Sequence, residues 1–140
     1  MPRAEYKSSD YASTGNVGSE AAPHVTQIVI IGAGAAGLST AGALKKIGLA
    51  STVLEQDMAI GGTWARRYDR LHLHTIRQLS GLAHLPLPRG YPRYVARDQF
   101  VRYLQHYATR LGLNVITGCE VKRVTPLDSE QQTGNGFTFE

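Results

Sequence analysis

The chain has 140 residues, with 15 basic and 11 acidic side chains, a formal net charge of +4 and 42% apolar residues. This length corresponds to one domain or part of one, and the ordinary globular composition excludes a wholly disordered chain. Because Cys119 is the single cysteine, a disulfide framework, a CxxC redox pair and a cysteine-based zinc site are excluded. The sequence contains no apolar run as long as a membrane-spanning helix and no signal peptide, so we expect a cytoplasmic protein.

The first half of the sequence predicts a tail followed by a βαβ unit. Residues 1–24 are rich in Ser, Ala, Gly and charge without an apolar period, which predicts a disordered tail. Residues 25–31 are apolar on both faces, as in a buried parallel strand. A glycine-rich turn follows, and apolar residues at helical spacing between 38 and 47 predict a helix that ends at Gly48. Residues 50–55 predict a second strand, which completes a right-handed βαβ crossover.

The second half of the sequence predicts a long loop, a helix and short strands. The stretch 56–96 is irregular, and loops of this length in a compact domain are usually functional. Residues 100–111 have the apolar spacing of an amphipathic helix, with Asp98 in its first turn and Gly112 just beyond its end.

Three strands are expected after that helix, at 113–116, 119–124 and 136–140, the last two joined by a polar turn at 128–135. The predicted fold class is therefore α/β, a Rossmann-like βαβ unit with a parallel sheet and a small β-meander. We expect residues 25–140 to form a partial domain truncated at its carboxyl end, because the sequence stops within an apparent strand.

The segment Gly32–Gly37 has the GxGxxG pattern of dinucleotide-binding turns. A buried strand precedes it, a helix follows it, and the acid Glu55 ends the next strand at about the expected spacing. Gly32 permits the tight turn, Gly34 lets a pyrophosphate approach the backbone, and Gly37 allows the helix to pack closely on the strands. A carboxylate at position 55 can accept hydrogen bonds from both hydroxyls of an adenosine ribose and would repel a 2′-phosphate, which disfavours NADP at this site. The spacing does not choose between NAD and FAD.

Four later segments follow in a characteristic order: Gly61–Trp64 (GGTW), Tyr68–Thr75 (YDRLHLHT), Leu85–Pro88 (LPLP) and Tyr91–Tyr94 (YPRY). With the glycine turn and its acid, they resemble the amino-terminal FAD region of flavin-containing monooxygenases. These are class B flavoprotein monooxygenases, and the resemblance is to the YUCCA-like branch, over residues 25–124.

The resemblance implies cofactor contacts for matching residues. The first turn would contact the FAD pyrophosphate, the second would lie along the pyrophosphate and ribityl part, and the segment with His72 and His74 would pass close to the flavin ring. The cofactor-binding residues predicted in this way are Gly32, Gly34, Ala35, Ala36, Gly37, Glu55, Gln56, Gly62, Thr63, Trp64, His74 and Thr75. No catalytic side chain is assigned.

Several of these residues have structural alternatives. The histidines at 72 and 74 would share one face of a strand, but no third ligand is evident, so no metal site is predicted. Trp64 could line the cofactor cleft or fill the core. Nine arginines and only two acids lie between Arg66 and Arg110, yet no nucleic-acid-binding signature accompanies them, and a solvated face is the simpler interpretation.

The resemblance implies that the chain is the amino-terminal part of an FAD-dependent monooxygenase that uses NADPH and O2. It would oxygenate a small organic substrate through a C4a-peroxyflavin. The NADPH site would lie in a region absent from this chain, because no second GxGxxG is present. Two alternatives remain open: another FAD-dependent oxidoreductase, or a non-catalytic dinucleotide-binding module.

Overall fold

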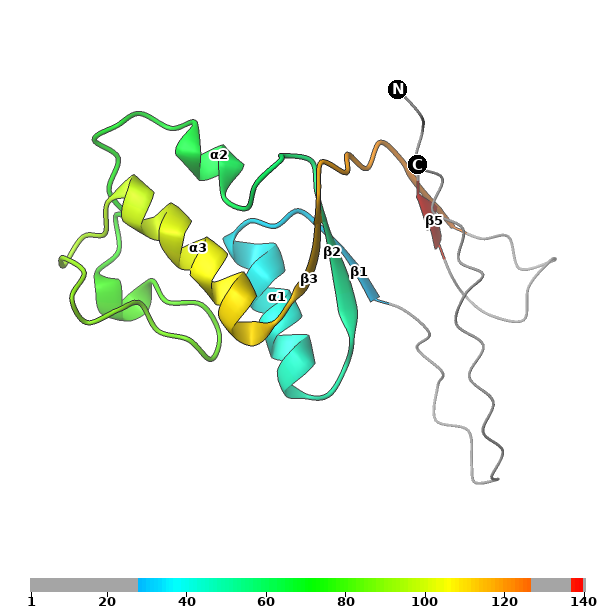
Figure 1. Ribbon diagram of the computed structural model, residues 1–140, viewed down its shortest axis with the longest axis horizontal. Coiled ribbons are helices and arrows are strands. Elements are labelled where there is room, and N and C mark those ends of the chain that lie inside the picture. Colours follow the sequence, from blue (N-terminus) through cyan, green and yellow to red (C-terminus); the bar gives the residue numbers. More distant parts are fainter. Residues whose placement is uncertain (1–27, 127–136, 140) are drawn as a thin grey trace.

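The computed structural model describes residues 28–126 and 137–139 (Figure 1). The predicted tail, residues 25–27 and the predicted turn at 128–135 lie outside the described residues. The elements in chain order are β1 (Ile28–Ile31), α1 (Ala35–Lys46), β2 (Ser51–Glu55), α2 (Gly62–Ala65), the 3-10 helix η1 (Arg77–Leu79), α3 (Arg97–Leu111), β3 (Asn114–Thr117), β4 (Val124–Pro126) and β5 (Phe137–Phe139).

The centre of the fold is an open parallel sheet in the order β1-β2-β3. Helix α1 connects the first pair of strands, and α3 lies in the connection between the second pair. Parallel crossovers are right-handed, and both of these advance in the same direction across the sheet, so both helices belong on the same face. Figure 1 shows α1 and α3 side by side on one side of the sheet. The predicted α/β class is confirmed.

Most predicted elements are present, with shifted ends. Helix α1 ends at Lys46, two residues before the predicted end at Gly48, and α3 ends at Leu111, immediately before Gly112 as predicted. The strand predicted at 119–124 is wrong, because regular pairing begins only at Val124, which lies opposite Phe139 in the antiparallel β4–β5 pair. The backbone N–H of Cys119 instead donates to the carbonyl oxygen of Glu55 at 2.8 Å, so this segment is held at the end of β2.

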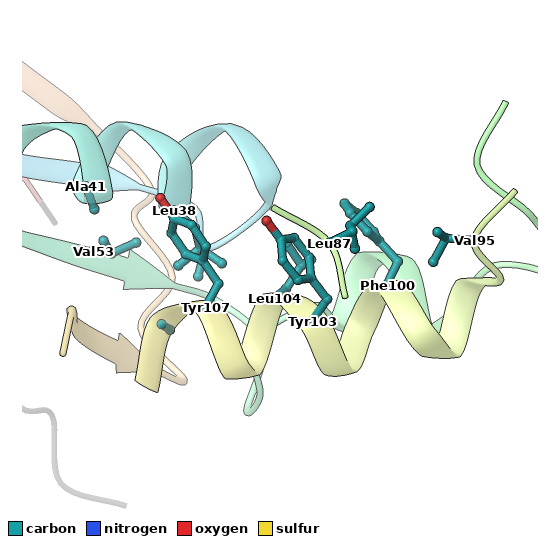
Figure 2. Close-up of a cluster of buried hydrophobic side chains, with 11 residues drawn as sticks. Leu38, Ala41, Val53, Leu87, Val95, Phe100, Tyr103, Leu104 and Tyr107 are labelled. Carbon is teal, nitrogen blue, oxygen red and sulfur yellow. The ribbon is translucent and has the colours of Figure 1, made fainter. Parts of the chain in front are cut away.

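The core fills the space between the sheet and the two long helices and extends along α3, where the long loop contributes Leu87 and Val95 (Figure 2). Residues on one stripe of α3 project toward α1 and the sheet, as the amphipathic pattern predicts. The fully buried side chains with the largest volumes are Tyr103, Tyr107, Leu38, Leu104, Val53 and Val95.

Two tyrosines of α3 also hold the long loop in place. The hydroxyl of Tyr103 accepts a hydrogen bond from Leu82 N–H at 2.6 Å and donates to the carbonyl of Leu85. The hydroxyl of Tyr107 donates to the carbonyl of Ala83 at 2.7 Å. Buried backbone polar groups require such partners, so the irregular stretch has a fixed position over α3.

These tyrosines predict how stability responds to high pH. Burial raises the pKa of Tyr103, and burial together with the neighbouring tyrosine raises the pKa of Tyr107. Above about pH 10 the unfolded chain therefore releases phenolic protons that the folded chain retains, and the free energy of unfolding must fall as pH rises.

Tyr107→Phe should reduce this decline between about pH 9 and 11 in urea unfolding experiments. The control Tyr68→Phe, at a tyrosine that is 65% exposed, should leave the decline unchanged. An identical pH dependence in the wild type and Tyr107→Phe would contradict the prediction.

Candidate dinucleotide-binding site

Three chain segments meet at one edge of the sheet. Because the strands are parallel, the carboxyl ends of β1, β2 and β3 lie together, which is where open α/β sheets bind ligands. Gly32 follows β1, Glu55 ends β2, and Gly118 follows β3. The N–H of Gly32 donates to Leu54 O at 2.7 Å, and the N–H of Gly118 donates to Asp57 O at 2.9 Å, which fixes these segments relative to each other.

The three glycines of the first turn differ in their structural surroundings. Gly32 has a φ of 95°, a backbone conformation that side chains disfavour. A Cβ added to Gly37 would lie 2.0 Å from the carbonyl oxygen of Gly32, so this glycine allows α1 to approach the strand. A Cβ added to Gly34 would meet no protein atom within 4 Å. The protein alone therefore does not explain a glycine at position 34, whereas a ligand approaching the backbone there would.

The amino terminus of α1 faces this open space without a cap. Gly34 is the N-cap residue, no side chain bonds to the helix terminus, and the first turn contains no acid. The first intrahelical hydrogen bond is donated by Leu38 to Gly34 O at 3.0 Å, so the N–H groups of Ala35, Ala36 and Gly37 have no intrahelical acceptor. These groups and the helix dipole form a site that favours an anion.

The carboxylate of Glu55 links the first turn to the segment after β2. Its Oε2 accepts a hydrogen bond from Ala33 N–H at 2.6 Å, and its Oε1 accepts one from Asp57 N–H at 2.9 Å. The residue is only 8% exposed, while the neighbouring Gln56 is exposed. A carboxylate has about four acceptor positions, so Glu55 retains capacity for the hydroxyls of a sugar.

The second glycine turn leads into the short helix α2. Gly61 adopts the left-handed conformation with a φ of 84°, and Gly62 begins the helix. Thr63 is exposed, whereas Trp64 is half-buried and packs edge-on against Phe100, with 4.8 Å between ring centroids. Trp64 therefore anchors α2 to α3, and a contact between its ring and a cofactor stays a prediction.

The segment with the two histidines is not a regular strand. It forms a single antiparallel bridge, between His72 and Ala96. His72, His74 and Thr75 are exposed, and the two histidines line an open hollow of about 580 Å³ together with Tyr68, Arg70, Leu73 and Tyr94. The residues of the first glycine turn do not line this hollow, and no group of three or more His, Cys, Asp or Glu side chains within the described residues could hold a metal ion.

Two arginines of the basic stretch form ion pairs within the described residues. Arg66 forms an ion pair with Asp57 at 2.7 Å, and this hydrogen bond raises the pKa of the Arg66 guanidinium. Arg97 is bound by Asp98 at 2.8 Å and Asp69 at 3.0 Å. Asp57 was not among the predicted site residues, although an acid two residues after Glu55 was the available signal.

The fold is an α/β unit with a parallel sheet, like the FAD-binding domains of its structural neighbours, and comparisons with known proteins give its family. Residues 29–134 match the family model described as pyridine nucleotide-disulphide oxidoreductase. The chain belongs to this family.

Within that family the chain matches the amino-terminal region of flavin monooxygenases, so the predicted resemblance is confirmed. It is 43% identical over 90 residues to the indole-3-pyruvate monooxygenase YUCCA6 of Arabidopsis thaliana, an alignment that covers 64% of this chain and 22% of that protein. The chain thus spans less than a quarter of the length of the curated relatives it matches.

Solved structures give the same result. A flavin-containing monooxygenase from Stenotrophomonas maltophilia superimposes with a TM-score of 0.66 at 31% identity, over 73% of this chain and 31% of that one. A steroid monooxygenase bound to NADP superimposes with a TM-score of 0.64 at 25% identity, over 75% and 22% of the two chains. Among the described residues, the structure contains no helix of the length and apolar character needed to cross a membrane.

Proposed function

We propose that this chain forms the FAD-binding part of a flavin-dependent monooxygenase that uses NADPH and O2 to oxygenate a small organic substrate, with residues 25–140 contributing to one FAD-binding domain. The observation that carries the proposal is the pairing of an uncapped helix terminus, beside an unobstructed Gly34, with the carboxylate of Glu55 at the same sheet edge. The flavin monooxygenase relatives support the same conclusion.

The residues of the first turn fit the adenosine diphosphate half of FAD. The N–H groups of Ala35, Ala36 and Gly37 would donate to the pyrophosphate, where the helix dipole adds attraction. The free acceptor positions of Glu55 would bind the adenosine ribose.

The second turn fits the remainder of the cofactor. Gly62, Thr63 and Trp64 would lie along it. Gln56 would lie beside Glu55, the acid that binds the ribose, and His74 and Thr75 would lie toward the flavin ring. When bound, the flavin supplies the redox chemistry that connects NADPH oxidation to O2 activation. The chain would bind and orient the cofactor and exclude water from it.

A thiol-disulfide reaction is less consistent with this chain, although the family's description includes it. Such chemistry uses a pair of neighbouring cysteines, whereas the 140 residues contain one. Cys119 is half-buried, and its backbone N–H is bound to Glu55 O.

Glu55, the acid proposed to bind the ribose, gives the first test of the proposed site. Glu55→Gln removes the negative charge and presents one carbonyl oxygen where two carboxylate oxygens now each accept a backbone N–H. We expect a weakening of FAD binding by about 10- to 100-fold, because charge-assisted hydrogen bonds contribute about 1.5–3 kcal/mol. Flavin fluorescence titration measures this, with the exposed Glu120→Gln as the control. Equal affinity in both variants would contradict the assignment of Glu55.

The activity itself is tested with NADPH. We expect the purified 140-residue chain to bind FAD weakly and to consume no NADPH, because its alignment covers only 22% of a monooxygenase relative. Steady NADPH oxidation by this chain would contradict the proposal that it supplies only the FAD-binding part. Absence of FAD binding would favour a nucleotide-binding module of another kind.

A further inference from the structure

Asp57 follows Glu55 and precedes the second glycine turn, and it contacts Glu55 on one side and the end of α2 on the other. Its N–H donates to Glu55 Oε1, and its carbonyl oxygen accepts from Gly118 N–H. Its Oδ1 accepts a hydrogen bond from Arg66, directly after α2. The backbone and the side chain of Asp57 therefore connect Glu55, the end of β3 and the second turn.

The second carboxylate oxygen of Asp57 faces Gly62. A Cβ built on Gly62 would lie 2.3 Å from Asp57 Oδ2, 2.7 Å from Cγ and 2.9 Å from Cβ, all shorter than contacts that real side chains make. Within the described residues, Oδ2 is buried without a hydrogen-bond partner. A buried unpaired acceptor is unfavourable, so hydrogen bonding of Oδ2 does not explain why an aspartate stands at position 57. Close packing of its carboxylate against the second turn does explain it.

We infer that Gly62 is a glycine because the Asp57 carboxylate occupies the space of its side chain, and that this contact sets the position of the second turn. Asp57 is thus a positioning residue for cofactor binding, an inference that rests on the proposed function. The alternative explanation is that the cofactor itself, along which the resemblance places Gly62, requires the glycine.

The two explanations predict different results when Asp57 is shortened. If the carboxylate is the obstacle, Gly62→Ala should harm the wild type but not an Asp57→Gly background, because that change removes all three conflicting atoms. Alanine is also the better helix former at the first position of α2, so Gly62→Ala should be neutral or slightly stabilising there. If the cofactor is the obstacle, Gly62→Ala should weaken FAD binding equally in both backgrounds.

The experiment is a double-variant cycle in the full chain with two readouts. Trp64 is the single tryptophan and lies two residues from Gly62, so its fluorescence reports the second turn without any cofactor. In the wild-type background, Gly62→Ala should shift the Trp64 emission and lower the thermal midpoint by about 5–10 °C, as expected for overpacking. In the Asp57→Gly background, the same substitution should leave both unchanged or raise the midpoint.

Two further variants serve as controls, one for the shape of the Asp57 side chain and one for a glycine-to-alanine substitution elsewhere. Asp57→Asn keeps the shape of the side chain, so Gly62→Ala should remain harmful beside it. Gly90→Ala, where a Cβ meets no atom within 4 Å, should leave the midpoint and the Trp64 emission unchanged. Equal losses from Gly62→Ala in the wild-type and Asp57→Gly backgrounds would overturn the inference.

FAD titration of the same variants separates the two proposals. Asp57→Gly should bind FAD about tenfold more weakly than the wild type, a change equivalent to about 1.4 kcal/mol. Adding Gly62→Ala to Asp57→Gly should not weaken FAD binding further. If the Trp64 and thermal results follow the inference while no variant binds FAD, Asp57 positions the turn and the proposed function fails.

Discussion

Gly37→Ala is expected to cost more than about 3 kcal/mol of folding stability, at or beyond the upper end of overpacking effects. The added methyl carbon would lie 2.0 Å from the Gly32 carbonyl oxygen and 3.3 Å from the Ile30 side chain. The obstacle is backbone, which cannot rotate away as a flexible side chain does, so α1 must move off the sheet. Because native domains are stable by only about 5–15 kcal/mol, this loss would remove a large share of the chain's free energy of unfolding.

Urea unfolding followed by circular dichroism measures the effect of Gly37→Ala. The matched control is Gly34→Ala, three residues earlier in the same turn, where the added carbon meets nothing. We expect this control to remain within about 0.5 kcal/mol of the wild type. Similar unfolding midpoints for Gly37→Ala and the wild type would show that α1 does not approach β1 as described.

Gly34→Asp should strongly weaken FAD binding while leaving the fold intact. Gly34 is the N-cap of α1, with φ −77° and ψ −176°, an extended conformation open to any residue. Aspartate is among the preferred N-cap residues, so the variant should be as stable as the wild type or slightly more stable. The same carboxylate would satisfy the amides that the pyrophosphate needs and would repel its charge. We expect FAD affinity to fall by at least about 100-fold, or about 2.7 kcal/mol.

The contrast between these two glycines is the informative result. Gly37→Ala should reduce stability, whereas Gly34→Asp should reduce FAD binding without loss of stability. Calorimetric titration with FAD and thermal unfolding of the same samples test both statements. If Gly34→Asp binds FAD as tightly as the wild type, the first turn does not contact the pyrophosphate.

The sequence predicts the βαβ unit well because its signals are local. A buried apolar run, three glycines at fixed spacing and an acid at the end of the next strand each follow from backbone geometry over few residues. The strand predicted at 119–124 was wrong because the alternation of residue types does not reveal that Cys119 N–H is already used by the carbonyl of Glu55.

Contacts between distant segments could not be predicted from the sequence. The hydroxyls of Tyr103 and Tyr107 bind a loop that lies more than 15 residues earlier in the chain, although the helical pattern marks both tyrosines only as apolar core. The close approach of the Asp57 carboxylate to Gly62, only five residues further on, depends on the path of the loop between them. No motif encodes that path.

Competition between fragments of FAD identifies which half of the cofactor the sheet edge binds. On this account the sheet edge binds the adenosine diphosphate half, so ADP should displace FAD from the chain while FMN at the same concentration should not. Glu55→Gln should weaken the binding of ADP-ribose more than that of inorganic pyrophosphate, because only the former carries the ribose. Displacement by FMN with no effect of ADP would contradict this account.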